Sequence, residues 1–199
     1  MASGHQLVTD PLMRGARWVT RSGIHLDRVA SPWLIRRFVD PEATFGFVDP
    51  EDAVPDGAVA FAIPGAPIGP HDTNGSAFRK ILRIHDVQRP ELDRMAEVVE
   101  VGIAVATGKV PKNARADVLA HGEALAAFSE AVIILRYGDD HAVLRDSAMY
   151  YDALYLTLWS ACGVDAPALP ADIVERLGVL RSAAEWGAVL PAWGETARA

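Results

Sequence analysis

A single cysteine, Cys162, occurs in the sequence, so no disulfide can form within the chain and a reducing compartment is indicated. No uninterrupted apolar run approaches the roughly 18 residues that a membrane-spanning helix needs. The N-terminus also lacks the charged start and apolar core of a signal peptide, and we interpret residues 1–13 as a disordered lead-in. These absences predict a cytoplasmic protein with no membrane partner, whose residues 14–199 form a single domain.

Lysine is scarce as well, and the basic charge is unevenly placed. The formal net charge is −7, which should repel nucleic acid, yet six arginines and one histidine lie between Arg14 and Arg37 beside a single acid, Asp27. An acidic protein with one basic stretch favours a local site for a small anion over a DNA-binding surface. We therefore expect no specific binding to nucleic acid. The alternative is that these arginines pair with the six acids that follow between Asp40 and Asp56.

Hydrophobic periodicity predicts a small β region followed by helices. Strands are expected at 17–20, 44–48 and 58–63, and a loop rich in glycine and proline at 64–75. Helices are expected at 31–39, 76–85, 90–107, 114–136, 139–161 and 171–182, before a tail with Trp186 and Trp193. Ser31 and Pro32 suit the cap and first position of the first helix. The expected fold is α+β, mainly α, with a small N-terminal β region packed on a bundle of about five helices and a C-terminal helical tail.

The densest polar cluster lies in the N-terminal segment and is the predicted ligand site. Arginine presents a planar fork that binds oxyanions through paired hydrogen bonds. Arg28 precedes the first predicted helix and is expected to reach an anion above a helix N-terminus, where free amides attract negative charge. The alternative is that a buried acid holds Arg28. The predicted ligand-binding residues are Arg21, His25, Asp27, Arg28, Trp33, Arg36 and Arg37.

A second set of polar residues is a candidate for catalysis or metal binding. His71 lies in the glycine- and proline-rich loop, where an imidazole is free to bind a metal or transfer a proton. Asp152 is a candidate general base, but an arginine partner from the N-terminal segment would make it structural, because a lone buried carboxylate is costly. Cys162 is expected to be a core residue. The predicted catalytic residues are His71, Asp152 and Tyr155, and the predicted ligands of a divalent metal ion are His71, Glu100 and His141.

The run Trp18-Val-Thr-Arg21, followed by Asp27-Arg-Val-Ala-Ser-Pro-Trp-Leu-Ile-Arg-Arg-Phe-Val-Asp-Pro-Glu-Ala43, resembles the signature of the ChrB family of chromate-resistance proteins. Shorter matching segments follow in the family's order up to residue 160. The resemblance implies a domain linked to chromate resistance. The residues that it carries over to this chain are Arg21, Asp27, Arg28, Trp33, Arg36, His71, Asp140, His141 and Asp152.

The sequence departs from the family pattern within the matched region. Ser76-Ala-Phe-Arg79 stands where the family shows a cysteine and an acid, and Ile103 stands where the family tends to place an acid. A thiol-based reduction of chromate is therefore not expected. Family members also carry an N-terminal regulatory region, which we expect this chain to lack.

Three functions remain open from the sequence. The first is a ChrB-like domain that binds a small anion or a metal-bound anion and serves chromate or oxyanion resistance or response. The second is a small metal-dependent or acid/base enzyme for an anionic organic substrate. The third is a structural partner of another protein, which would show little ligand selectivity. A common pocket would require that Arg21 or Arg28 lies within reach of His71.

Overall fold

The computed structural model describes residues 14–109, 111–163, 166, 168 and 170–182. The lead-in predicted at 1–13 and the tail with Trp186 and Trp193 lie outside these residues. The strands are β1 (Arg17–Arg21), β2 (Thr44–Val48) and β3 (Val59–Ala60). The helices are α1 (Asp27–Leu34), which continues as the π-helical turn η2 (Ile35–Val39), and then α2 (Ala77–Ile84), α3 (Pro90–Ala106), α4 (Ala116–Leu135), α5 (Asp140–Cys162) and α6 (Ile173–Ser182).

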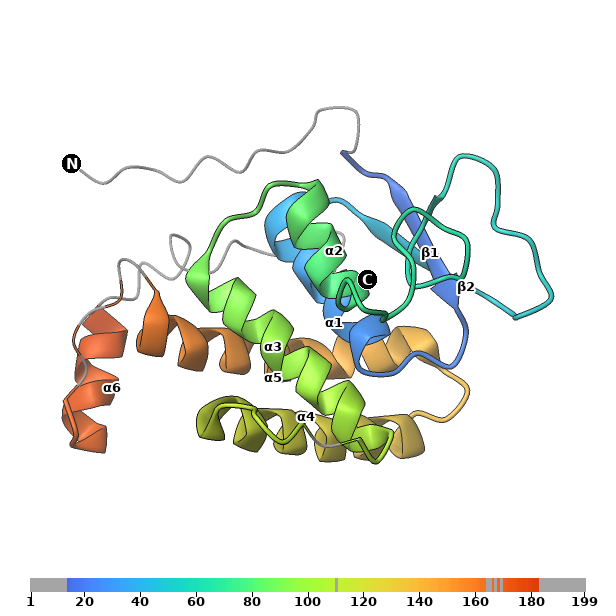
Figure 1. The fold of residues 1–199 in the computed structure, drawn as a ribbon. Helices are drawn as coiled ribbons and strands as arrows, with labels where there is room; N and C mark the ends of the chain where they lie inside the picture. The colour runs from blue at the N-terminus through green and yellow to red at the C-terminus, as the bar shows by residue number, and fades with distance from the viewer. Residues whose placement is uncertain (1–13, 110, 164–165, 167, 169, 183–199) are drawn as a thin grey trace.

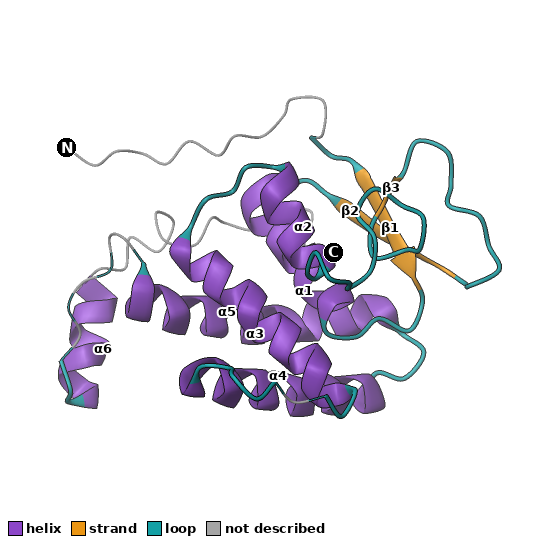
Figure 2. Ribbon diagram, in the orientation of Figure 1, coloured by secondary structure: helices purple, strands orange, loops and turns teal. Residues whose placement is uncertain are grey.

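A small sheet at one side of the molecule adjoins a much larger set of helices (Figure 2). The sheet is parallel in the order β2-β1-β3, and α1 supplies the crossover that parallel β1 and β2 require. The third strand is shorter than predicted, because the chain turns at Ala62, whose φ is 50°, while Phe61 makes only an isolated bridge to Ile68. The observed architecture confirms the predicted α+β, mainly α fold.

The first helix begins at Asp27, so the prediction that Ser31 caps it is wrong. Ser31 lies buried inside α1 and its hydroxyl donates to Asp27 Oδ1 at 3.3 Å. The chain enters the helix through Leu26, whose φ of 44° turns it sharply enough for its carbonyl oxygen to accept from Ala30 N at 2.8 Å. Pro32 therefore lies inside the helix, where it cannot donate the usual main-chain hydrogen bond.

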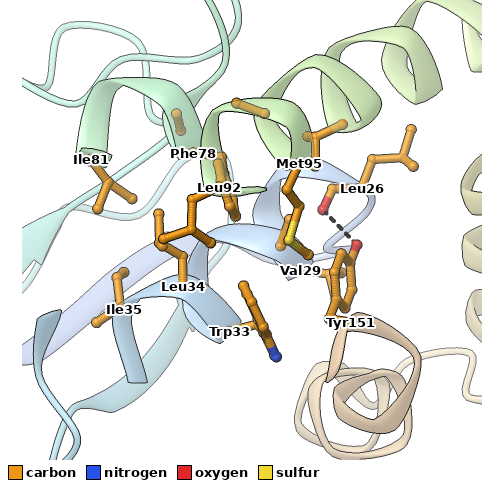
Figure 3. Close-up of a cluster of buried hydrophobic side chains, with 14 of the residues drawn as sticks. Leu26, Val29, Trp33, Leu34, Ile35, Phe78, Ile81, Leu92, Met95 and Tyr151 are labelled. Carbon is orange, nitrogen blue, oxygen red and sulfur yellow. Dashed lines mark hydrogen bonds between the residues drawn. The ribbon is translucent and has the colours of Figure 1, made fainter. Parts of the chain in front are cut away.

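The core forms around α1, which contacts α2, α3 and α5. Figure 3 shows side chains from these four helices meeting in one cluster. Trp33 and Leu34 come from α1, Phe78 from α2, Met95 from α3 and Tyr151 from α5. The apolar side chains of α1 and η2 anchor this segment in the core, and the arginines predicted to bind a ligand lie at its ends, Arg28 in α1 and Arg36 and Arg37 in η2.

Helices α3 and α4 meet at a close approach between Gly122 and Val101. A Cβ atom at position 122 would lie 2.5 Å from Val101 Cγ1 and 3.1 Å from Gly102 N. We expect Gly122→Ala to lower the free energy of unfolding by about 2 kcal/mol, because overpacking forces the helices apart. Urea unfolding measures the change. Gly178→Ala is the control, since nothing lies within 4 Å of that added Cβ; an equal effect at both positions would contradict the close-packing explanation.

One helix of the described residues, α4, is long and apolar enough by length and composition to cross a membrane. Its mean hydropathy is 1.6 over an 18-residue window of which only 33% is buried. The apolar residues of α4 do not form one uninterrupted run, because single acids and a histidine lie among them. In Figure 1, α4 forms an outer border of the helical layer, with α3 and α5 on its inner side.

Candidate functional site

Arg21 and Arg28 direct their guanidinium groups at main-chain oxygens. Arg21 Nη1 donates to the carbonyl oxygens of Asp49 and Asp52 at 2.6 and 2.8 Å. Arg28 donates to the carbonyl oxygens of residues 21, 22 and 23, at 3.2, 3.2 and 2.9 Å. Arg28 thereby ties the turn after β1 to the first turn of α1. Within the described residues its guanidinium donates to these main-chain oxygens and makes no hydrogen bond to a buried acid, which was the alternative that the sequence left open.

Arg36 and Arg37 are adjacent in η2 but have different surroundings. Arg36 Nε donates to the carbonyl oxygen of Ala43 at 3.2 Å, and its guanidinium carbon lies 5.1 Å from the centre of the Phe45 ring. Arg37 forms an ion pair with Asp152, with 2.5 Å between Nη2 and Oδ2. Pairing with the acidic stretch, the alternative raised by the sequence, is seen for Arg14, which forms an exposed ion pair with Glu42.

Four predicted site residues lie together in the fold: Trp33 and Arg37 from the N-terminal segment meet Asp152 and Tyr155 of α5, more than a hundred residues further along the chain. Asp152 Oδ1 accepts from Trp33 Nε1 at 2.7 Å and from Arg37 Nε at 3.1 Å. The side chains of Arg37 and Asp152 are only 5% and 15% exposed. The Trp33 ring centre lies 5.7 Å from that of Tyr155. Asp152 therefore has the arginine partner that the structural interpretation of this residue predicted.

Tyr155 is held as a neutral phenol. Its hydroxyl donates to Glu91 Oε1 at 3.0 Å, and the same oxygen accepts from Arg89 Nε at 2.6 Å. Burial raises the pKa of Tyr155 far above its ordinary value. Cys162, predicted to be a core residue, is only half-buried; burial raises the pKa of its thiol, which donates to the carbonyl oxygen of Leu158.

Asp27 caps α2 rather than its own helix. Its carboxylate accepts from Ala77 N at 2.7 Å and from Phe78 N at 3.0 Å, and the neighbouring Ser76 Oγ accepts from Arg79 N at 3.2 Å. These bonds engage the first three amides of α2, so a free anion has no open helix end there. Burial raises the pKa of Asp27, and the hydrogen bonds to the carboxylate offset this only in part.

The two histidines of the predicted site have different surroundings. His25 is half-buried, and burial followed by the charge of Arg28 lowers its pKa. His71 is exposed in the loop before α2. Its neighbour Asp72 is paired with Lys80, while Arg21 and Arg28, the arginines that a common pocket would need beside His71, bond to the main chain.

The three predicted metal ligands are not gathered into one group. Glu100 accepts from Arg79 at 2.7 and 2.8 Å and from Ser76 N at 3.0 Å. Burial raises the pKa of Glu100, but these hydrogen bonds outweigh it and the net change is downward. His141 lies with its ring edge against Phe47. Within the described ranges, no group of three or more His, Cys, Asp or Glu side chains is placed to hold a metal ion.

The positions that depart from the family pattern have structural partners in this chain. Ser76 caps α2, and Arg79 pairs with Glu100 on α3. A helix cap and an ion pair between α2 and α3 therefore occupy the place where the family shows a cysteine and an acid. Ile103, the other departure, packs partly buried against the core.

Two acids at the start of α5 are structural. Asp139 caps the helix by accepting from Ala142 N at 2.9 Å. Asp140 accepts from Gly23 N and Ile24 N at 2.9 and 3.0 Å. The start of α5 is thereby fixed to the turn that Arg28 also holds.

A surface cavity of about 450 Å³ lies between the 64–75 loop and α2. Its volume falls in the usual range for sites that bind small molecules. The charged residues in its lining are Asp72, Lys80 and Arg83, and Asn74 and loop glycines and prolines complete it. Lys80 Nζ is bound to Asp72 Oδ2 at 3.0 Å and to the carbonyl oxygens of Gly69 and Pro70 at 3.3 and 2.6 Å.

Arg83 is the cavity residue with donors to spare. It is exposed, and Nη1 donates to the carbonyl oxygen of Asn74 at 2.8 Å. A guanidinium carries five N–H groups, so one such bond leaves a fork available to a ligand. Sequence reasoning identified the loop but missed Lys80 and Arg83. The signal was present, because two cations three residues apart lie on one face of the short helix that follows the loop.

Comparison with known proteins gives one family and one curated relative. The chain is 35% identical over 102 residues to "Protein ChrB" of Cupriavidus metallidurans (strain ATCC 43123 / DSM 2839 / NBRC 102507 / CH34), covering 48% of this chain and 31% of that protein. The chain thus matches about a third of the relative's length. No solved structure matches. The family described as "ChrB, C-terminal domain" matches residues 18–158, which is more than half of the sequence, and the chain belongs to this family.

Proposed function

We propose that this domain binds a small oxyanion, of the chromate or sulfate type, in the cavity between the 64–75 loop and α2. Membership of the ChrB family links the chain to chromate resistance. The observation that carries the proposal is the lining of the cavity, where Arg83 keeps free donors at an exposed position. Arginine binds tetrahedral oxyanions through two parallel hydrogen bonds, which gives it an advantage over lysine at such sites.

The other charged residues of the cavity, Lys80 and Asp72, set the net charge of its lining. Lys80 is bound by three oxygens, so it contributes positive charge rather than a new hydrogen bond. Asp72 stays ionised, because the hydrogen bond from Lys80 lowers its pKa. Two cations and one carboxylate leave the lining with an excess of one positive charge in a protein whose net charge is −7.

The enzyme hypothesis gains no specific support. Glu100 is engaged by Arg79, Asp152 by Arg37 and Trp33, and Tyr155 by Glu91. The polar atoms of each of these candidate groups are hydrogen-bonded to a neighbouring side chain. We therefore place the ligand at Arg83 rather than at the residues predicted to be catalytic.

Replacing Arg83 by glutamine is expected to weaken chromate binding about tenfold or more, because a charge-assisted hydrogen bond contributes roughly 1.5–3 kcal/mol. Arg83→Lys should recover only part of the affinity, since it keeps the charge but loses the fork. Isothermal titration with chromate, and separately with sulfate, measures the effect.

Arg145→Gln is the matched control, because Arg145 is also an exposed helical arginine and lies outside the cavity lining. Melting temperatures of all variants separate binding from folding. If Arg83→Gln and the unmodified protein bind chromate with equal affinity, Arg83 is not part of the binding site. If the unmodified protein binds neither chromate nor sulfate, the proposed oxyanion function is wrong.

A further inference from the structure

Helix α4 is apolar on two opposite faces. Its inner face is buried against the rest of the protein through Val118, Leu125 and Val132, and Ser129 Oγ accepts from Leu26 N at 3.3 Å. Its outer face is exposed and is also apolar. The exposed residues at helical spacing are Ala116, Ala120, Ala124, Ala127, Ala131 and Ile134. At 100° per residue they fall within an arc of roughly 80°, which we call the outer face of α4.

Large side chains extend the outer face at the C-terminal end of α4. Ile134 is 68% exposed and Leu135 is 74% exposed, and Tyr137 in the following turn is 91% exposed. Arg136 forms an ion pair with Asp146, which brings the end of α4 against α5. Met149, 75% exposed, lies one turn further along α5.

Such a face is costly to leave in water. A helix that is apolar all round is ordinarily enclosed by protein or lipid, and contiguous exposed apolar patches mark interaction sites. The inner face of α4 packs against α3 and α5, and this packing leaves the outer face uncovered. Burying Ile134 and Leu135 would remove two large aliphatic side chains from water, which is favourable.

The charge along one edge of the outer face indicates which kind of partner can cover it. Glu123 and Glu130 lie two turns apart along one edge of the apolar arc, and both are exposed. Within the part of the chain that the structure describes, neither makes a hydrogen bond or an ion pair. The surface is thus an apolar strip with a row of negative charge at its side. Its complement is an apolar strip with a row of positive charge.

We propose that the outer face of α4 docks an amphipathic helix of a partner protein, whose apolar side is flanked by lysine or arginine. The alanines let a second helix approach closely, and the two glutamates then pair with its basic edge. A second copy of this chain fits less well. Antiparallel pairing of two α4 helices about a twofold axis brings each acidic edge to the same side, where the glutamates repel. A membrane surface fits less well too, because anionic lipids repel both the glutamates and a net charge of −7.

Two synthetic helical peptides of the length of α4 test the proposal. Both carry alanine and leucine on one side, and their flanking residues are lysine in one peptide and glutamate in the other. Fluorescence anisotropy should show that the full chain binds the lysine peptide and not the glutamate peptide. Ala127→Arg, at the centre of the outer face, should abolish this binding. Ala53→Arg, the same change in an exposed loop beside the sheet, should leave it unaltered.

The double variant Glu123→Lys/Glu130→Lys decides whether the acidic edge selects the partner. It should bind the lysine peptide at least tenfold more weakly and acquire binding to the glutamate peptide, whereas a merely sticky surface would bind both peptides throughout. Circular dichroism and melting temperature establish that each variant is folded. Binding of neither peptide by the unmodified chain would overturn the proposal.

Two further results would also overturn it. If the unmodified chain sediments as a dimer that Ala127→Arg dissociates, a second copy of the chain covers the face. Flotation with phosphatidylcholine vesicles that Ala127→Arg abolishes would assign the face to a lipid surface. A monomer that stays free of vesicles and binds only the lysine peptide supports the helical partner.

Discussion

Asp27→Ala is expected to lower the free energy of unfolding by about 3 kcal/mol or more. The carboxylate is 6% exposed and accepts hydrogen bonds from Ala77 N, Phe78 N and the hydroxyl of Ser31. Loss of a helix cap costs roughly 1–2 kcal/mol, and each buried amide left without a partner costs roughly 1–3 kcal/mol. Urea unfolding followed by circular dichroism measures the loss. The control is Asp172→Ala, which removes a carboxylate that accepts from Val174 N and Glu175 N at an exposed helix start.

Asp27→Asn adds a pH dependence to the same prediction. The pKa of Asp27 is raised above its ordinary value of 3.8, mainly by burial. The folded protein therefore binds this proton more tightly than the unfolded chain does. Its contribution to the free energy of unfolding is largest below pH 3.8 and falls as the pH rises through the folded pKa. Asparagine does not titrate there, so the stability difference between the two proteins should narrow with rising pH. A difference that widens would show that the folded pKa lies below 3.8.

Arg37→Met is expected to lower the free energy of unfolding by about 3 kcal/mol, because it leaves the carboxylate of Asp152 poorly compensated in the interior. Asp152→Leu should cost a similar amount. The double variant should recover much of the loss, since it removes both charges together. A double-mutant cycle measured by urea unfolding gives the coupling between the two side chains.

The exposed pair of Arg14 and Glu42 provides the control for Arg37. Their side chains are 71% and 48% exposed, so Arg14→Met should cost less than about 1 kcal/mol. Titration of the Arg37 variant with chromate distinguishes a structural role for Arg37 from the ligand-binding role that the sequence predicted. A structural Arg37 predicts a large loss of stability with affinity retained in the folded fraction. If the variant loses chromate affinity while its stability is unchanged, Arg37 binds the ligand, as the sequence predicted.

These predictions move the ligand away from the segment richest in arginine. Arg21, Arg28 and Arg36 each donate to main-chain oxygens, and Arg37 pairs with a buried acid. Their charges serve to join β1, α1, η2 and α5. The cavity beside Arg83 therefore remains the proposed anion site, because Arg83 lines it and makes one hydrogen bond there, to the carbonyl oxygen of Asn74.

The sequence by itself determined the fold class and the family. Apolar periodicity placed α3, α4 and α5 within a few residues of their observed ends, because a helix of that length buries one face regardless of its neighbours' identity. The long motif between Trp18 and Ala43 pointed to the ChrB family, and the match over residues 18–158 confirms it. The sequence also predicted that Asp152 needs an arginine, since a lone buried carboxylate is unfavourable.

Only the tertiary structure decided how the polar groups are paired. Local pattern could not tell that Asp27 caps a helix 50 residues further along, that Arg37 rather than a neighbouring arginine meets Asp152, or that Glu100 pairs with Arg79. A hydrogen bond needs its two atoms within about 3 Å. Residues far apart in sequence reach that distance only once the core has set the helices in place. Hydrophobic periodicity depends on residues that are close in sequence, so it can be detected before the structure is known. The hydrogen-bond partner of each donor and acceptor depends on residues that only the folded protein brings together.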